Sequence, residues 1–195
     1  MQAVALFARL VWVILKSSML KMSSTLKNQP ILSLRSGSPI ATALEPIINP
    51  NNLKILGWWC RANTGPGDRV LLAEDVREVM PRGLAVNDEM ALSEPADLAR
   101  HAEVLKIHWQ LIDKQVKTKR HKLGKVSDYS YDSEGLFVQK LYVAGSLVKV
   151  FSSSDTSIID RIQILEVTDS YILVRDTDVK ATEAELAPAI GAVTT

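Results

Sequence analysis

The residue types best suited to catalysis or metal binding are few and scattered in this sequence. The histidines are His101, His108 and His121, and the single cysteine is Cys60. Two histidines seven residues apart can share a helix face, but a pair without a thiol or acid partner makes a poor metal site. The common sequence motifs of zinc, nucleotide and serine-hydrolase chemistry do not occur. We therefore expect no enzymatic activity, no cofactor and no metal ion.

Charge is distributed unevenly along the chain. Residues 104–125 hold seven lysines and arginines against one acid, a net charge of +6, whereas residues 66–103 hold nine acids and four basic residues. A basic stripe on a nearly neutral chain can bind RNA phosphates through counterion release. The alternative interpretation is a solvated face that aids solubility. The candidate partner-binding residues in this stripe are Lys117, Lys119, Arg120, Lys122 and Lys125.

Two adjacent tryptophans, Trp58 and Trp59, form a second candidate site. They lie in the apolar segment Lys54–Arg61, which is typical of a strand. Neighbouring side chains of a strand point to opposite faces, so we expect one indole in the core and the other exposed or covered by the second half of the chain. Trp is favoured at binding hot spots, so a partner-binding anchor is the alternative to a contact within the chain.

The elements that must position these residues follow from composition and turn chemistry. The chain has 195 residues, 47% of them hydrophobic, and a net charge of +1, which is typical of a globular protein with one ordinary domain or two small ones. A single cysteine excludes an internal disulfide framework and is compatible with a reducing compartment. We expect a cytoplasmic, bacterial-type protein.

The apolar run over residues 3–15 allows three interpretations. It is shorter than the roughly 20 residues that a spanning helix needs, and it contains Arg9. A misassigned translation start, with Met19 or Met22 as the true start, is one interpretation. An amphipathic or membrane-anchoring segment and a cleaved signal peptide are the others.

Short apolar segments separated by Gly, Pro and Asn turns dominate residues 31–86 and resume after Lys117, which is typical of small β-barrels. Pro46 favours an edge strand or a bulge for the segment Ile40–Ile48. Between the two groups, the spacing of apolar residues over Glu94–Leu111 predicts a helix. Past Lys180 the small-residue composition predicts a flexible tail.

The two β regions resemble each other as an internal repeat. When Ile40 is aligned with Leu123, the turn that begins at Asn49 falls on the turn that begins at Asp132 without a gap. The aligned pairs that follow are Leu53 with Leu136, Ile55 with Val138, Trp58 with Leu141 and Trp59 with Tyr142.

The first repeat resembles the opening of a PRC-barrel domain through Gly37-Ser38-Pro39-Ile40-Ala41, Asn49-Pro50 and Lys54-Ile55-Leu56-Gly57. The second repeat carries Leu123-Gly124-Lys125-Val126, the Asp132–Gly135 turn and the Ile158–Ile162 segment. Ala41 stands where the family favours Gly, and neither repeat has a clear Val/Ile-Pro step. The family includes the photosynthetic reaction-centre H subunit and the C-terminal half of a bacterial ribosome-maturation factor, which share docking rather than a reaction.

We therefore expect a mainly β chain of two tandem PRC-type barrels joined by a helical linker. The expected units are an apolar leader or misassigned start over 1–22, a first barrel over 23–92, a helical linker over 93–116, a second barrel over 117–180 and a tail over 181–195. The leading hypothesis is a non-catalytic adaptor that docks a protein or ribonucleoprotein partner, in RNA metabolism by analogy with the maturation factor. The alternative is a membrane-associated scaffold anchored by residues 3–15.

Overall fold

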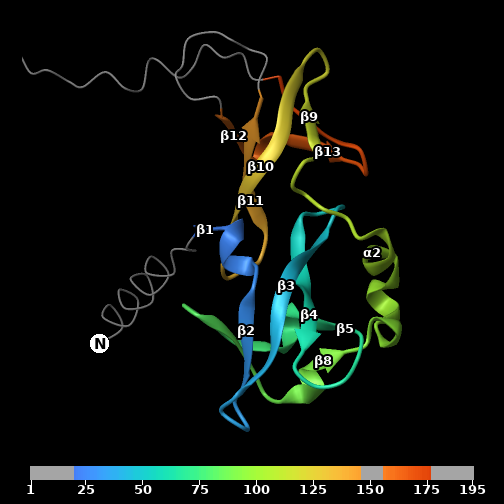
Figure 1. Cartoon of the computed structure of the whole chain (residues 1–195). Helices are drawn as coiled ribbons and strands as arrows, with labels where there is room; N and C mark the ends of the chain where they lie inside the picture. Colours follow the sequence, from blue (N-terminus) through green and yellow to red (C-terminus); the bar gives the residue numbers. More distant parts are fainter. Residues whose placement is uncertain (1–19, 146–155, 177–195) are drawn as a thin grey trace, which may run out of the picture.

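The computed structural model describes residues 20–145 and 156–176 and is mainly β, with a sheet that curls into half a barrel (Figure 1). Most of the predicted leader, over residues 1–19, lies outside the described residues, as does the whole predicted tail over 181–195. The strands form two sheets: residues 29–93 supply the first, and residues 115–174 together with a short strand over residues 20–22 supply the second.

The first sheet has two of its strands in parallel and the others antiparallel. Its spatial order is β6 (Val76–Met80), β7 (Gly83–Val86), β2 (Gln29–Ser33), β3 (Pro39–Asn49), β4 (Lys54–Ala62), β5 (Asp68–Leu72) and β8 (Leu92–Ser93). β2 and β7 are the parallel pair. β2 pairs with β3 only between Pro39 and Ala43, so Pro46, which has no N–H to donate, lies where β3 pairs with β4 alone. A bulge between Ala43 and Glu45 precedes it.

The second sheet repeats this order. It runs β13 (Ile164–Val167), β14 (Tyr171–Val174), β9 (Gln115–Lys117), β10 (Lys122–Asp132), β11 (Val138–Ala144) and β12 (Thr156–Asp160), with β9 and β14 parallel. A 3-10 turn follows β5 as η2 (Ala73–Asp75) and β12 as η6 (Arg161–Gln163). Strand β1 (Leu20–Met22) crosses from the N-terminal side and pairs with the far end of β10.

The turns of the two long hairpins are built alike. Asn49 accepts the N–H of Leu53 at its carbonyl oxygen, and Asp132 accepts that of Leu136, over 2.8 and 2.9 Å. The side chains of Asn49 and Asp132 each accept the N–H two residues on, as in Asx turns. Leu53 and Leu136 then take φ values of 54° and 55°. The aligned turns in the sequence are therefore equivalent in conformation.

The two sheets meet where these turns end. The N–H of Ile55 donates to the Leu136 carbonyl over 2.7 Å, and the N–H of Val138 donates to the Leu53 carbonyl over 3.0 Å. Because Leu53 aligns with Leu136 and Ile55 with Val138, the two hydrogen bonds join equivalent residues, with the donor in the first half in one and in the second half in the other. The repeats are thus related by an approximate two-fold axis that passes near the bridge between Lys54 and Phe137.

In the described part of the chain, the two halves share one main hydrophobic core. One cluster of buried residues runs from Ile31 and Trp58 in the first half to Val126 and Leu141 in the second. Leu26, in the 3-10 turn η1 (Ser23–Leu26), also belongs to it. The halves therefore do not have separate interiors, and we expect them to fold together.

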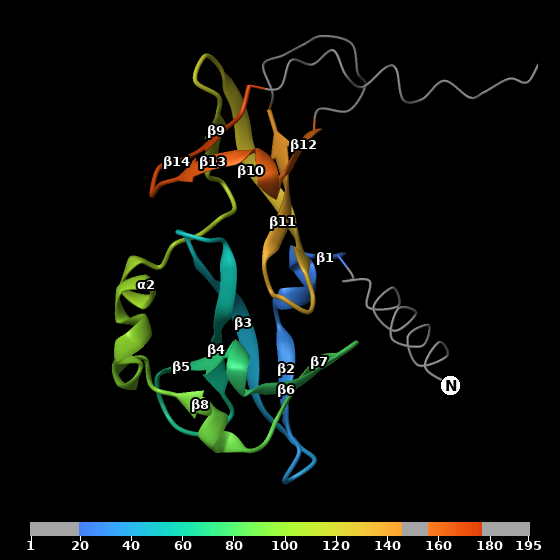
Figure 2. The ribbon, with the colours of Figure 1, turned by 180° about the vertical axis from the view of Figure 1, so that it is seen from behind.

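The expected helix over Glu94–Leu111 is shorter than predicted. The α-helix, α2, spans only Ala102–Ile107, and three 3-10 turns precede it: η3 (Glu89–Ala91), η4 (Pro95–Asp97) and η5 (Ala99–His101). His108 ends α2 in a left-handed conformation with φ of 45°, after which Trp109 is buried in the shared core. α2 lies along the first sheet (Figure 2). In the described residues, none of the helices is long and apolar enough to cross a membrane.

Candidate functional site

The basic stripe is centred on the hairpin of β9 and β10. Thr118 holds the connecting turn: its side-chain oxygen accepts the N–H of Arg120 over 3.2 Å and that of His121 over 3.0 Å. The N–H of Thr118 also donates to the His121 carbonyl over 2.8 Å. These bonds leave Lys119 and Arg120 exposed at the tip of the hairpin.

Half of the basic residues around this hairpin are engaged within the chain. Lys117 Nζ lies 3.4 Å from the ring centroid of Tyr171, and Arg120 Nε lies 3.8 Å from a carboxylate oxygen of Asp176. Lys114 donates to the Asp169 carbonyl, and its Nζ lies 5.4 Å from the Trp109 ring centroid. These side chains bind β14 and its flanking loops to the rest of the second half.

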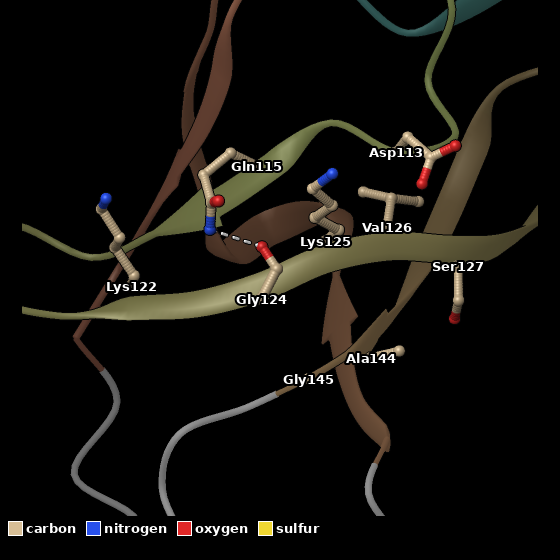
Figure 3. A pocket seen from close by; sticks show the side chains of 9 residues that line it. All are labelled: Asp113, Gln115, Lys122, Gly124, Lys125, Val126, Ser127, Ala144 and Gly145. Atoms are coloured by element: carbon tan, nitrogen blue, oxygen red, sulfur yellow. Dashed lines mark hydrogen bonds between the residues drawn. The ribbon is translucent and has the colours of Figure 1, made fainter.

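The other three lysines, Lys119, Lys122 and Lys125, are exposed and form no ion pair with any residue that the structure describes. Lys122 and Lys125 border an open hollow of about 480 Å³, and their side chains leave the same side of β10 (Figure 3). The hollow is lined by Asp113, Gln115, Lys122, Gly124, Lys125, Val126, Ser127, Ala144 and Gly145. Lys122 and Lys125 carry ammonium groups that form no described ion pair at the rim of this hollow, and such groups form a surface that suits phosphate oxygens.

Gly124 gives the hollow its shape. Its φ is +141°, and a Cβ built there would lie 2.1 Å from the Ala144 carbonyl oxygen. Gln115 lies on β9 and donates from Nε2 to the Gly124 carbonyl over 2.7 Å, which holds β9 against β10 (Figure 3). Gly124 therefore lets β10 and β11 approach closely beneath the two lysines.

The two tryptophans separate as the strand pattern predicts, but the second is covered differently. Trp58 is 1% exposed and belongs to the shared core. Trp59 lies on the outer face of β4 and stacks on His108, with ring centroids 4.9 Å apart and planes at 15°. The cover of Trp59 thus comes from the segment after α2 and not from the second sheet. A role for either indole in binding a partner stays a prediction.

The residues with catalytic or metal-binding side chains lie apart from one another. Cys60 is fully buried, burial raises the pKa of its thiol to about 12, and Sγ donates to the Trp58 carbonyl over 3.3 Å. A thiol in this state is a poor nucleophile. Across residues 20–145 and 156–176, no three His, Cys, Asp or Glu side chains come together in a way that could hold a metal ion.

Arg161 forms a contact across the two halves that the sequence analysis did not predict. Arg161 donates to the Val138 carbonyl over 3.2 Å and to the Asn52 carbonyl over 2.7 Å. Its guanidinium carbon lies 4.7 Å from the Phe137 ring centroid, on the face of a ring that Lys54 also approaches at 5.6 Å. The signal was the repeat itself, since an aligned pair of turns can meet across a two-fold axis.

Comparison with known proteins gives no relative from which a function could be transferred. No protein-family model matches the chain, and no curated protein matches it significantly. The functional argument therefore rests on the residues and their geometry.

Proposed function

We propose that this protein is a non-catalytic adaptor that docks a ribonucleoprotein partner through the β9–β10 hairpin. In this proposal the two halves are tandem PRC-barrel-like modules joined by the segment that contains α2. Support comes from the repeated strand order, the equivalent hairpin turns and the sequence motifs of the two repeats. Docking, rather than a reaction, is the activity that this resemblance implies.

The proposal rests on a difference among the basic residues: some have partners within the chain and others do not. Lys114, Lys117 and Arg120 have partners inside the chain, so their presence has a structural explanation. Lys119, Lys122 and Lys125 are exposed and have no such explanation. Clustered cations that are free to exchange counterions for phosphates give sequence-independent affinity for nucleic acid.

The first half contributes little to this surface. Its sheet and the segment before α2 hold most of the acids between residues 66 and 103, and the basic hairpin belongs to the second half. This polarity orients the molecule toward a polyanion, with the hairpin tip foremost. A protein component of the partner is then free to contact the remaining surface, including the region around Trp59.

The test is RNA binding as a function of salt. Fluorescence anisotropy with a labelled single-stranded RNA is measured on the full chain and on the triple variant Lys119→Glu, Lys122→Glu, Lys125→Glu. We expect the variant to bind at least about tenfold more weakly, and the slope of log affinity against log salt to fall by about 2, since each phosphate contact contributes about 0.7 for single strands.

The matched control is Arg82→Glu, Arg100→Glu, Lys106→Glu, which changes the net charge equally at exposed positions away from the hairpin. We expect this triple to keep most of the affinity and the full salt slope. Equal losses in both triples, or no RNA binding by the unmodified chain, would contradict the proposal.

A further inference from the structure

A small cavity lies between the two halves, beside the segment that leads from α2 to β9. Its volume is about 130 Å³, close to the roughly 150 Å³ of an engineered protein cavity that binds benzene. The chain just before β2, the part of β3 beyond its pairing with β2, the segment after α2 and one residue of β10 enclose it. Its apolar lining residues are Pro46, Ile48, Trp109, Leu111 and Ile112.

The repeat places this cavity on the approximate two-fold axis. In the alignment of the two repeats Pro46 is equivalent to Tyr129, and both residues line the cavity. β2 pairs with β3 as β9 pairs with β10, and this register makes Lys27 equivalent to Ile112, which lines the cavity as well. Equivalent residues meet only near the axis that relates them. The cavity is therefore a feature of the contact between the halves, a common position for ligand sites.

Tyr129 lines the cavity and carries a buried hydroxyl without a hydrogen-bond partner. Its side chain is 1% exposed, and no residue that the structure describes donates to or accepts from its Oη. Burial and the neighbouring side chains of Asp128, Tyr131 and Glu45 raise the pKa of this hydroxyl, which therefore keeps its proton. Buried hydroxyls are normally hydrogen-bonded, so an unpartnered one at a cavity indicates a place for a bound molecule.

Glu45 supplies a carboxylate to the cavity, and its contacts within the chain are loose. Lys27 Nζ lies 4.0 Å from Oε1, and Gln110 donates from Nε2 to Oε2 over 3.5 Å. The equivalent carboxylate in the second half, that of Asp128, accepts a hydrogen bond from Ser23 Oγ over 2.5 Å. Exposed ion pairs with long distances contribute little, so a ligand that donates to Glu45 displaces little in exchange.

The charges around the cavity favour a cation. Glu45 and Asp113 are the acids that line it and Lys27 is the base, which gives a net charge of −1. A carboxylate accepts the strongest hydrogen bonds from an ionised donor such as an ammonium group. The oxygen of a protonated phenol, such as that of Tyr129, accepts a hydrogen bond as well.

We propose that this cavity binds a small primary amine, with its ammonium group between Glu45 and the Tyr129 hydroxyl and its apolar part against Trp109 and Ile48. The ammonium group donates to the carboxylate and to the phenol oxygen, which gives the hydroxyl the partner that it lacks. The volume limits the apolar part to about one ring or a short branched chain. The site does not involve the exposed lysines of the β9–β10 hairpin, so it is independent of RNA binding.

Titration with simple amines tests the proposal. Benzylamine and isobutylamine are added to the full chain at neutral pH, and binding is followed by heteronuclear NMR. Toluene, which has nearly the shape of benzylamine but no ammonium group, is the matched control ligand. We expect benzylamine to bind with a stoichiometry of one and to shift the indole N–H signal of Trp109 more than those of the other tryptophans. Toluene should bind at least about tenfold more weakly, because it makes no charged hydrogen bond.

Three variants locate the ammonium group. Glu45→Gln should weaken benzylamine binding at least about tenfold, whereas Glu78→Gln, at an exposed carboxylate on β6, should leave it unchanged. Tyr129→Phe keeps the ring and should weaken binding about three- to tenfold. Without ligand it should not lower the melting temperature, because the hydroxyl that it removes has no partner among the described residues.

Three results would overturn the proposal. The first is the absence of binding by both amines. The second is toluene binding as tight as that of benzylamine, which would mean an apolar cavity without recognition of the ammonium group. The third is an unchanged affinity in Glu45→Gln, which would place the amine elsewhere on the molecule.

Discussion

The first and second sheets have the same strand order and differ at their surfaces. In the first, the outer face around Val70 is apolar and covered, and the hairpin of β2 and β3 carries one arginine, Arg35, in its turn. In the second, the corresponding face exposes Ile158, and the hairpin of β9 and β10 carries an unpaired cluster of lysines. The backbone contacts where the halves meet are therefore equivalent, whereas the surfaces that face solvent differ in charge and in apolar exposure.

The largest expected effect tests whether the halves share one interior. Trp58 and Leu141 are equivalent and almost fully buried in the same cluster. Trp58→Ala should lower the free energy of unfolding by about 3–5 kcal/mol and Leu141→Ala by about 2–5 kcal/mol. Urea unfolding followed by circular dichroism and tryptophan fluorescence should give one coincident transition in each variant. A biphasic curve, in which one half unfolds alone, would contradict the claim that the two halves share one interior.

A smaller effect distinguishes the two equivalent hairpin positions Gly124 and Ala41. Gly124→Ala forces a Cβ against the Ala144 carbonyl at a positive φ and should cost about 1–3 kcal/mol of stability. Ala41→Gly, the reverse exchange in the first half, should cost only about 0.5–1 kcal/mol. Chemical denaturation of both variants measures the difference. Equal costs would mean that the two hairpins tolerate the same side chains.

An effect that depends on pH concerns Cys60 and its equivalent, Val143. Burial raises the pKa of the folded thiol from its ordinary 9.0 to about 12. Above pH 9 the unfolded chain releases this proton and the folded chain keeps it, so Cys60 makes stability fall as pH rises from 9 to 12. Cys60→Val should therefore lose about 1.4 kcal/mol less stability by pH 10 than the unmodified chain.

Urea unfolding across this pH range is the measurement. Burial also raises the pKa values of Tyr129 and Tyr131, so a residual alkaline loss should persist in the variant. An unchanged pH dependence in Cys60→Val would contradict the assignment of this component to the thiol.

Sequence predicted the features that depend on local chemistry. The turns at Asn49 and Asp132 were aligned correctly because Asx side chains and left-handed residues fix hairpin conformation within a few residues. Strand alternation predicted that one of Trp58 and Trp59 would be buried, and the structure shows that it is Trp58. The predicted helix over Glu94–Leu111 was too long. The spacing of apolar residues does not show that the helix ends at His108 or that Trp109 packs in the shared core.

The features that sequence did not predict are long-range. Strand β1 pairs with β10 across more than half of the chain, and neither segment carries a local signal for the other. The basic stripe was visible in the sequence, but the sequence did not show which of its residues have partners within the chain. Only the structure places Tyr171 beneath Lys117 and Asp176 beside Arg120, leaving Lys119, Lys122 and Lys125 as the exposed set.

The most direct measurement is affinity purification of the full chain from native cell extract, with and without RNase, in parallel with the Lys119→Glu, Lys122→Glu, Lys125→Glu variant. We predict that ribonucleoprotein components copurify with the unmodified chain, and that both RNase and the triple substitution remove them. A stoichiometric protein partner that survives RNase and is retained by the variant would contradict docking through the hairpin, and would assign the binding to another surface of the molecule.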